Sequence, residues 1–203
     1  MTGRDSPNPR DGRPPGATLL APEEADALIP GHVRTREELF AWEQVNILEA
    51  QQWARRARVS ALEEATIREA HRRMFDRTWK WAGSYRHSDK NIGADWTTIP
   101  LEVRKLVDDG AFWIDHQTFP LDEIVVRLHH RLVQIHPFPD GNGRHARLWC
   151  DLLLRQNGRP AFDWKNERLG PPGEARRAYI DALRAADAGD FQPLCDLLLA
   201  DRH

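Results

Sequence analysis

The sequence has little of the features that mark three common classes of protein. Cysteine occurs only twice, at Cys150 and Cys195, and the two form no metal-binding spacing, which argues against a disulfide framework. No apolar run approaches the ~18 residues of a membrane span, and the N-terminus lacks a signal-peptide core. The formal net charge is −2, so the chain offers no electrostatic case for nucleic acid or an anionic membrane. We therefore expect a soluble, cytoplasmic protein that binds neither.

Apolar residues recur at helical spacing along most of the chain. They make up 40% of its 203 positions, which is enough for one sizeable core. A capping box, Thr35 with Glu38 three residues on, predicts a helix that runs to about Arg58. Further helices are expected from Ser60, from Pro100, over 120–135 and 144–156, and near 174–188 and 190–200. In the first helix the side chains expected to face the core are Leu39, Trp42, Val45, Leu48 and Trp53.

Two segments depart from the helical pattern. Residues 92–99 are rich in strand formers and predict a short β-hairpin. Residues 1–18 hold four prolines and three glycines and cannot bury enough apolar surface to order themselves. The expected organisation is a disordered tail over 1–18, an arm and helix over 19–59 packed on the core, and a domain over 60–200. The fold class predicted is mostly α, a helical bundle with one small β-hairpin.

Residues 136–147, which read HPFPDGNGRHAR, form a tight loop between two of these helices. Gly141 and Gly143 allow positive φ, so that successive backbone amides can form a concave nest for an anion. A helix that starts at about Gly143 adds the positive end of its dipole at the same point. The loop therefore predicts a phosphate site.

Four charged or titratable side chains surround that site. Arg144 and Arg147 lie at i and i+3 of the following helix and can grip further phosphate oxygens, which favours a polyphosphate. Asp140 would repel bare phosphates, but it can hold a magnesium ion that bridges them. His136 has the unperturbed pKa, about 6.5, that suits a general base near neutral pH.

Other readings of the loop are weaker. The spacing of residues 141–146 satisfies the loose dinucleotide fingerprint, but a helix-period segment precedes it where that fold needs a strand. A purely structural turn would not need two arginines and an acid. A zinc site lacks a His-Glu-x-x-His motif or a cysteine pair, although four histidines lie close in sequence: His129, His130, His136 and His145.

These residues match, position by position, the signature of the Fic family, His-x-Phe-x-Asp/Glu-Gly-Asn-Gly-Arg-x-x-Arg. Fic proteins are mostly AMP transferases that bind ATP with magnesium and pass AMP to a Ser, Thr or Tyr hydroxyl of a target protein. The resemblance implies a Fic-type helical bundle and an enzyme in which His136 deprotonates the hydroxyl, Phe138 anchors the loop and Asp140 holds magnesium. The residues that it assigns to the phosphates of ATP are Gly141, Asn142, Gly143, Arg144 and Arg147.

The resemblance extends beyond the loop. Trp81-Ala-Gly-Ser-Tyr-Arg86 is similar to the run that precedes the flap in Fic proteins, where a hairpin pairs with the target backbone. That similarity assigns target docking to Asp95, Trp96, Thr97 and Thr98. The N-terminal part resembles the bacterial Fic subgroup called mobile mystery protein B, which implies an antitoxin-like or helix-turn-helix companion protein. The target itself is not named by the sequence.

Two alternatives to AMP transfer stay open. One is a non-catalytic or toxin-like nucleotide-binding interaction module, although a retired site would not need His136, Asp140 and Arg147 together. The other is transfer of a different phosphate-containing group, such as phosphocholine. A kinase-like branch of the family carries Lys at the place of Gly143, so the glycine argues against phosphorylation.

Many Fic proteins restrain themselves with an inhibitory helix, Ser/Thr-x-x-x-Glu-Gly/Asn, whose glutamate pairs with the second arginine of the signature. With Asn46 at the last position of that motif, Val45 stands where the glutamate should be and Ala41 where Ser or Thr should be. Glu43 is expected on a different face of the helix. We therefore expect Arg147 to be unpaired by this helix, and the enzyme to be competent by itself or restrained by a separate partner.

Overall fold

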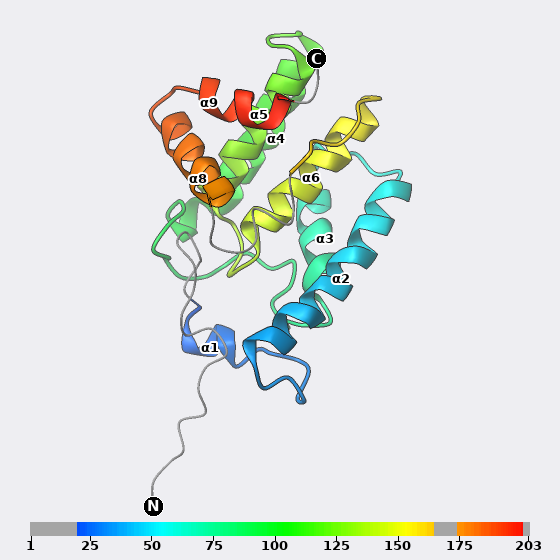
Figure 1. The fold of residues 1–203 in the computed structure, drawn as a ribbon, viewed down its shortest axis with the longest axis vertical. Helices are drawn as coiled ribbons and strands as arrows, with labels where there is room; N and C mark the ends of the chain where they lie inside the picture. Colours follow the sequence, from blue (N-terminus) through cyan, green and yellow to red (C-terminus); the bar gives the residue numbers. More distant parts are fainter. Residues whose placement is uncertain (1–19, 165–173, 201–203) are drawn as a thin grey trace, which may run out of the picture.

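The computed structural model describes residues 20–164 and 174–200, and within these ranges it contains helices and no strands (Figure 1). A single isolated bridge joins Leu28 and Trp79. The predicted mostly α fold is confirmed, whereas the tail predicted over 1–18 lies outside the described residues. The helices are α1 (Pro22–Ala25), α2 (Arg36–Arg56), α3 (Glu64–Phe75), the 3₁₀ helix η1 (Trp96–Thr98), α4 (Ile99–Asp115), α5 (Leu121–Ile135), α6 (Asn142–Gln156), α8 (Glu174–Asp187) and α9 (Gln192–Leu199).

Helix α2 starts where the sequence places its cap. The Glu38 backbone N–H donates to Thr35 Oγ1 at 3.2 Å, and the Thr35 N–H donates back to the Glu38 carboxylate at 3.0 Å. The cap predicted at Ser60 is wrong, because α3 begins at Glu64. The segment between them is held by α6 instead: buried Ala61 donates its N–H to Gln156 at 2.8 Å.

The predicted β-hairpin is wrong as well. The Asp95 carboxylate accepts hydrogen bonds from the Thr97 N–H at 2.8 Å and from the Thr97 hydroxyl at 2.6 Å. These bonds bend the backbone into η1, which leads directly into α4. The local side-chain cap therefore outweighs the strand propensity of these residues. Pro100 lies in the first turn of α4, as expected.

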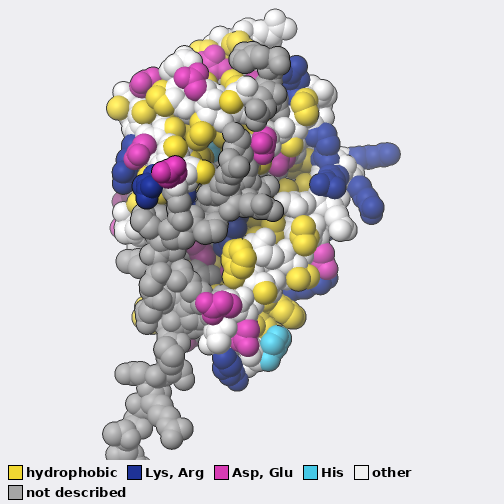
Figure 2. All heavy atoms as spheres, in the orientation of Figure 1, with side chains coloured by type: hydrophobic (Ala, Val, Ile, Leu, Met, Phe, Trp, Pro, Cys, Tyr) yellow, Lys and Arg dark blue, Asp and Glu magenta, His cyan; other side chains and the backbone are white. Residues whose placement is uncertain are grey.

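The core is built around α5 and α6, which lie side by side in the middle of the molecule (Figure 1). Helix α4 packs on α5, α3 and α2 pack on α6, and α9 joins α5 to α8. Within the described residues, no helix is both long enough and apolar enough to cross a membrane. Figure 2 shows acidic, basic and apolar side chains mixed over one face, as a net charge of −2 suggests.

The face of α2 that packs against the core differs from the predicted face. Leu39, Ile47, Ala50 and Ala54 are buried, together with the polar pair Glu43 and Asn46. Two of the residues expected inside are exposed, Val45 at 53% and Leu48 at 57%. The prediction from the apolar pattern failed because the buried face of this helix contains a carboxylate and an amide.

Candidate active site

The loop between α5 and α6 is shaped by two residues in the left-handed region. His136 ends α5 with φ 54°, and Gly141 precedes α6 with φ 78°. A Cβ on Gly141 would lie 2.5 Å from the Phe75 ring, so only glycine fits there. Gly143 has no such constraint, because it is already helical, and the expected positive φ is wrong there. Open space surrounds the position of its missing Cβ, which leaves room for a ligand to approach the backbone.

The loop is fixed from the inside by Phe138 and Asn142. The fully buried Phe138 ring stacks on His71, with centroids 3.8 Å apart. The Asn142 side chain accepts from the Phe138 N–H at 2.9 Å and donates to the Phe138 carbonyl at 2.8 Å. Phe138 is thus the anchor that was expected. The Asn142 amide serves the loop itself, which leaves its backbone N–H, at the start of α6, for the predicted phosphate role.

His71 of α3 was not singled out from the sequence. The Gly83 N–H donates to its Nδ1 at 3.0 Å, so that Nε2 must carry the proton and donate to the Asp140 carbonyl, also at 3.0 Å. Burial lowers the pKa of this imidazole well below its ordinary value. A neutral histidine therefore connects the Trp81–Arg86 run to the active loop.

His136 is held as a neutral base. Its Nδ1 donates to the Val133 carbonyl at 3.2 Å, which leaves the acceptor lone pair on Nε2. Burial, aided by the positive charges of Arg86 and Lys90, lowers the pKa of His136 to about 4, while Val133 and Asp140 act in the opposite direction. The ring is 5% exposed. At neutral pH this imidazole can accept a proton.

Arg86, the last residue of the Trp81–Arg86 run, fixes the backbone of that base. Its guanidinium is 1% exposed and donates to the carbonyls of His136 at 2.8 Å, of Ser88 at 2.7 Å and of Ala94. Gly93 lies against the base, since a Cβ there would lie 2.7 Å from the His136 Cβ. The segment from Ser88 to Ala94 is therefore attached to the loop between α5 and α6.

Arg144 pairs with Glu43, which was expected to lie on a different face of α2. Its Nη1 lies 2.7 Å from Glu43 Oε2, and the other Glu43 oxygen accepts from the Trp79 indole at 2.9 Å. Burial lowers the pKa of Arg144, but attraction to Glu43 and Asp140 outweighs it and leaves that pKa above its ordinary value. The prediction that Glu43 faces away from the site is wrong. Leu39, Glu43 and Ile47 follow one another at i+4, a spacing that could have revealed it.

Arg147 lies three residues further along the same helix. Tyr179 of α8 is near it, and the Tyr179 hydroxyl lies 2.8 Å from His129 Nε2. Burial is the main cause that lowers the pKa of Arg147, and the nearby charges of Arg144 and Arg176 act in the same direction. Three arginines thus gather beside the loop, a concentration of positive charge that suits a polyphosphate.

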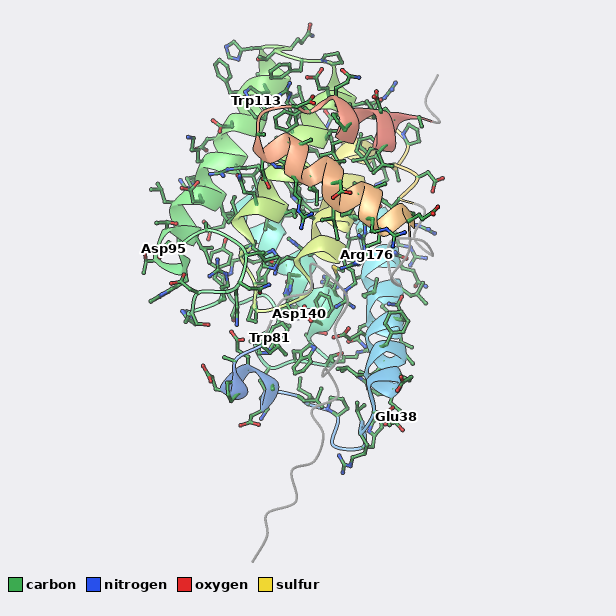
Figure 3. The ribbon with its side chains drawn as sticks, turned by 60° about the vertical axis from the view of Figure 1, so that its left-hand side comes forward. Glu38, Trp81, Asp95, Trp113, Asp140 and Arg176 are labelled. Atoms are coloured by element: carbon green, nitrogen blue, oxygen red, sulfur yellow. The ribbon has the colours of Figure 1, made fainter. Side chains whose placement is uncertain are left out.

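Asp140 fits a metal ion only in combination with a nucleotide. Its carboxylate lies 3.9 Å from the Arg144 guanidinium, and its side chain is 16% exposed. Among the residues the structure describes, no group of three or more His, Cys, Asp or Glu side chains could hold a metal ion. Magnesium needs only one or two carboxylates when substrate phosphates complete its shell. Figure 3 labels Asp140, which lies in the loop before α6, and Arg176, which lies on α8.

The residues assigned to target docking lie on the surface. Asp95, Trp96 and Thr97 are exposed, and Trp96 retains 38% of its accessible surface. Since they form η1, their backbone is not extended for strand pairing, and the expected docking mode is not available to them in this conformation.

Comparison with known proteins agrees with this geometry. Residues 61–154 match the model of the Fic/DOC family. The protein adenylyltransferase fic-1 of Caenorhabditis briggsae is 33% identical over 131 residues, which cover 63% of this chain and 24% of that protein. Residues 134–508 of C. elegans Fic-1 superpose with a TM-score of 0.63 at 26% identity, over 86% of this chain and 51% of that one.

A bacterial structure shares the fold at lower identity. The BepC protein of Bartonella tribocorum, solved with bound AMPPNP, has a TM-score of 0.67 at 19% identity, over 87% of this chain and 96% of that one. The chain spans about a quarter of the length of the curated relative from C. briggsae. The likeness therefore concerns one domain, and the expected bacterial origin stays a prediction.

Proposed function

We propose that this chain, whose residues 61–154 match the Fic/DOC family, is a protein adenylyltransferase that moves AMP from magnesium-bound ATP to a Ser, Thr or Tyr hydroxyl of another protein. The observation that carries the proposal is the orientation of His136. Its Nδ1 donates to the Val133 carbonyl, which makes Nε2 the acceptor nitrogen, and His136 precedes the first residue of α6 by six positions.

The proposed reaction is an in-line displacement at the α-phosphorus of ATP. The target hydroxyl oxygen forms a bond to this phosphorus while the bond to the oxygen that bridges the α- and β-phosphates breaks. The hydroxyl proton passes to His136 Nε2, and pyrophosphate leaves with the electron pair of the broken bond. A base that is neutral at pH 7 can accept that proton, and its low pKa lets it release the proton again.

The remaining groups would bind the negatively charged phosphates or offset their charge. The backbone N–H groups at the start of α6 point toward the phosphates, and Arg144 and Arg147 would bind the β- and γ-phosphates. Asp140 would hold the magnesium ion, whose charge offsets that of the departing pyrophosphate. The Glu43 carboxylate already binds Arg144 Nη1, so it would compete with the phosphates for this guanidinium and restrain ATP binding. A companion protein stays a prediction.

Radiolabelled ATP tests this function directly. Purified protein is incubated with magnesium, a cell lysate, and ATP labelled either at the α- or at the γ-phosphate. We expect the α-label in protein bands and the γ-label in free pyrophosphate, with no transfer by His136→Ala.

Each other outcome names a different function. Label from the γ-position in protein would mean phosphorylation. Neither label in protein, with tight binding of ATP by the parent protein, would favour the non-catalytic nucleotide-binding module. Absence of ATP binding would contradict both.

A further inference from the structure

Helix α2 lies along one side of the molecule, with one face on the core and the other toward solvent (Figures 1 and 3). Its exposed face carries six residues in alternating steps of three and four, which we call the α2 stripe: Glu38, Ala41, Val45, Leu48, Gln52 and Arg55. Such steps, repeated every seven residues, are the spacing by which two helices pack in a coiled coil. The stripe therefore has the pattern of a helix-packing surface, although it faces solvent.

The centre of the α2 stripe is apolar and symmetric. Val45 and Leu48 are each more than half exposed, and the midpoint of the stripe falls between positions 46 and 47. A second α2 that runs in the opposite direction, related by a twofold axis through this midpoint, places Val45 of each copy opposite Leu48 of the other. Ala41 then lies opposite Gln52. The stripe is thus complementary to itself, which is what a twofold interface between identical chains requires.

The charges at the two ends of α2 fit the same arrangement. Glu37 and Glu38 lie in its first turn, and Arg55 and Arg56 lie in its last turn. An acidic start and a basic end suit the dipole of any helix, so these charges alone would not point to a partner. Their distances from the midpoint are equal, however, so an antiparallel copy places Glu37 opposite Arg56 and Glu38 opposite Arg55. A parallel copy would instead place like charges together at both ends.

We propose that the exposed face of α2 is a homodimer interface, on which a second copy of this chain packs its own α2 in the antiparallel direction. The inference is independent of the proposed function, because Glu43 lies on the other, buried face of α2. The helix has 21 residues and is about 31 Å long, so one helix pair buries an area at the low end for protein interfaces. We therefore expect a weak, reversible dimer with a Kd on the order of 100 µM, so that dilute protein is monomeric.

Sedimentation velocity on the whole chain, from about 5 to about 500 µM, measures this association. Leu48→Glu places a carboxylate in the apolar centre of the interface and should weaken dimerisation at least about tenfold. Because Leu48 is exposed in the monomer, the variant should stay folded, which circular dichroism and thermal unfolding of dilute protein verify. Leu101→Glu, the same change at an exposed leucine of α4, is the matched control and should dimerise as the parent does.

Charge reversal tests the antiparallel direction. Glu37→Lys and Arg56→Glu each place like charges together at both ends of the helix pair, so each variant alone should dimerise about three- to tenfold more weakly at low salt. Mixed in equal amounts, the two variants complement each other at both ends. The mixture should therefore form heterodimers about as readily as the parent protein forms homodimers.

Loss of the dimer in Leu48→Glu, its retention in Leu101→Glu and its recovery in the mixture of charge variants would together establish the interface. A parent protein that is monomeric at every concentration would overturn it, and the exposed face of α2 would then serve another partner. A dimer that persists in Leu48→Glu would form through a different surface. Charge variants that each associate as the parent does would exclude the antiparallel pairing.

Discussion

Helix α2 and helix α8 bring different chemistry to the two arginines of α6. Glu43 of α2 offers Arg144 a carboxylate, which is the same kind of partner as a phosphate. Near Arg147 lie Tyr179 and Arg176 of α8, and burial raises the pKa of Tyr179 to about 12, so that its hydroxyl is neutral. A carboxylate would compete with a nucleotide for Arg144, whereas a neutral hydroxyl and a second cation would not compete for Arg147. Two arginines three residues apart in the sequence therefore have different electrostatic surroundings.

The pair of Glu43 and Arg144 is a direct constraint on the site. Glu43 is 5% exposed and Arg144 25% exposed in this pair, so little water screens it. The same carboxylate accepts from Trp79, and the Arg144 guanidinium lies 4.9 Å from the centre of the Phe75 ring. An incoming phosphate has to replace the charge of Glu43 rather than simply add to it.

The largest effect is expected when the proposed general base is removed, because AMP transfer depends on it. His136→Ala should lower the rate of AMP transfer by about 10²–10⁴-fold, the usual contribution of a general base, with the affinity for magnesium-ATP unchanged. Single-turnover transfer and calorimetry measure the two quantities. His116→Ala, at an exposed histidine that ends α4, is the matched control and should keep parental activity. Parental transfer by His136→Ala would remove the assigned base.

The second effect tests whether α2 restrains the site. Glu43→Gln keeps an oxygen for Trp79 but removes the charge opposite Arg144. We expect the affinity for ATP to rise about tenfold, because phosphate no longer displaces a carboxylate. Without nucleotide the variant should be less stable by about 1–3 kcal/mol, less than the loss of a fully buried pair because Arg144 is partly exposed.

Glu49→Gln is the matched change on the same helix, since Glu49 pairs with Arg77 at the surface, where the two side chains are 48% and 60% exposed. Its stability should change by less than about 1 kcal/mol, and its ATP affinity not at all. If Glu43→Gln binds ATP as the parent does, Glu43 is a structural support for α2 rather than a competitor.

Much of the site could be predicted because its residues are close together in the sequence. The loop over 136–147, its place between two helices, and the starts of α2 and α4 all depend on local chemistry: prolines, glycines and the Thr35 cap. The anchor role of Phe138 also followed from the resemblance and is confirmed by its burial.

What could not be predicted depends on contacts between distant segments. The rotation of α2 places Glu43 inward only because Arg144 and Trp79, 101 and 36 residues away, supply its partners. The hairpin failed for a local reason, since one carboxylate at Asp95 outweighs the strand propensity of three residues. Tyr179 follows Arg147 by 32 residues, and nothing near it in the sequence points to that arginine.

Low pH should destabilise the protein on both sides of α6, and the pKa values of two buried histidines indicate by how much. His129 supports the α8 side through the Tyr179 hydroxyl, and His145 Nε2 donates to the Ile67 carbonyl of α3 at 2.8 Å. Burial lowers their pKa values to about 3 and about 4. The unfolded chain takes up protons near pH 6.5 and the folded protein does not, so stability is complete above that pH and falls as the pH drops toward 4.

Each of these two histidines should contribute a loss of about 2 kcal/mol between neutral pH and pH 5. Urea unfolding at pH 7.5 and 5.0 measures it. His129→Gln and His145→Gln should each reduce the loss by that amount, whatever their stability at pH 7.5. A variant that loses as much as the parent would show that its histidine is already accessible to protons in the folded protein.

The smallest expected effect belongs to Val45→Glu, which separates charge from position on α2. Two residues on a helix lie about 200° apart around its axis, and Val45 is 53% exposed where Glu43 is buried. A carboxylate at 45 should therefore point into solvent, change stability by less than about 0.5 kcal/mol and leave ATP affinity within about twofold of the parent. The motif alignment with Asn46 last predicts the opposite, a clear loss of affinity. Calorimetry on Val45→Glu beside Glu43→Gln decides between them. A tenfold loss in the first variant with no gain in the second would mean that α2 turns its other face to the arginines in solution.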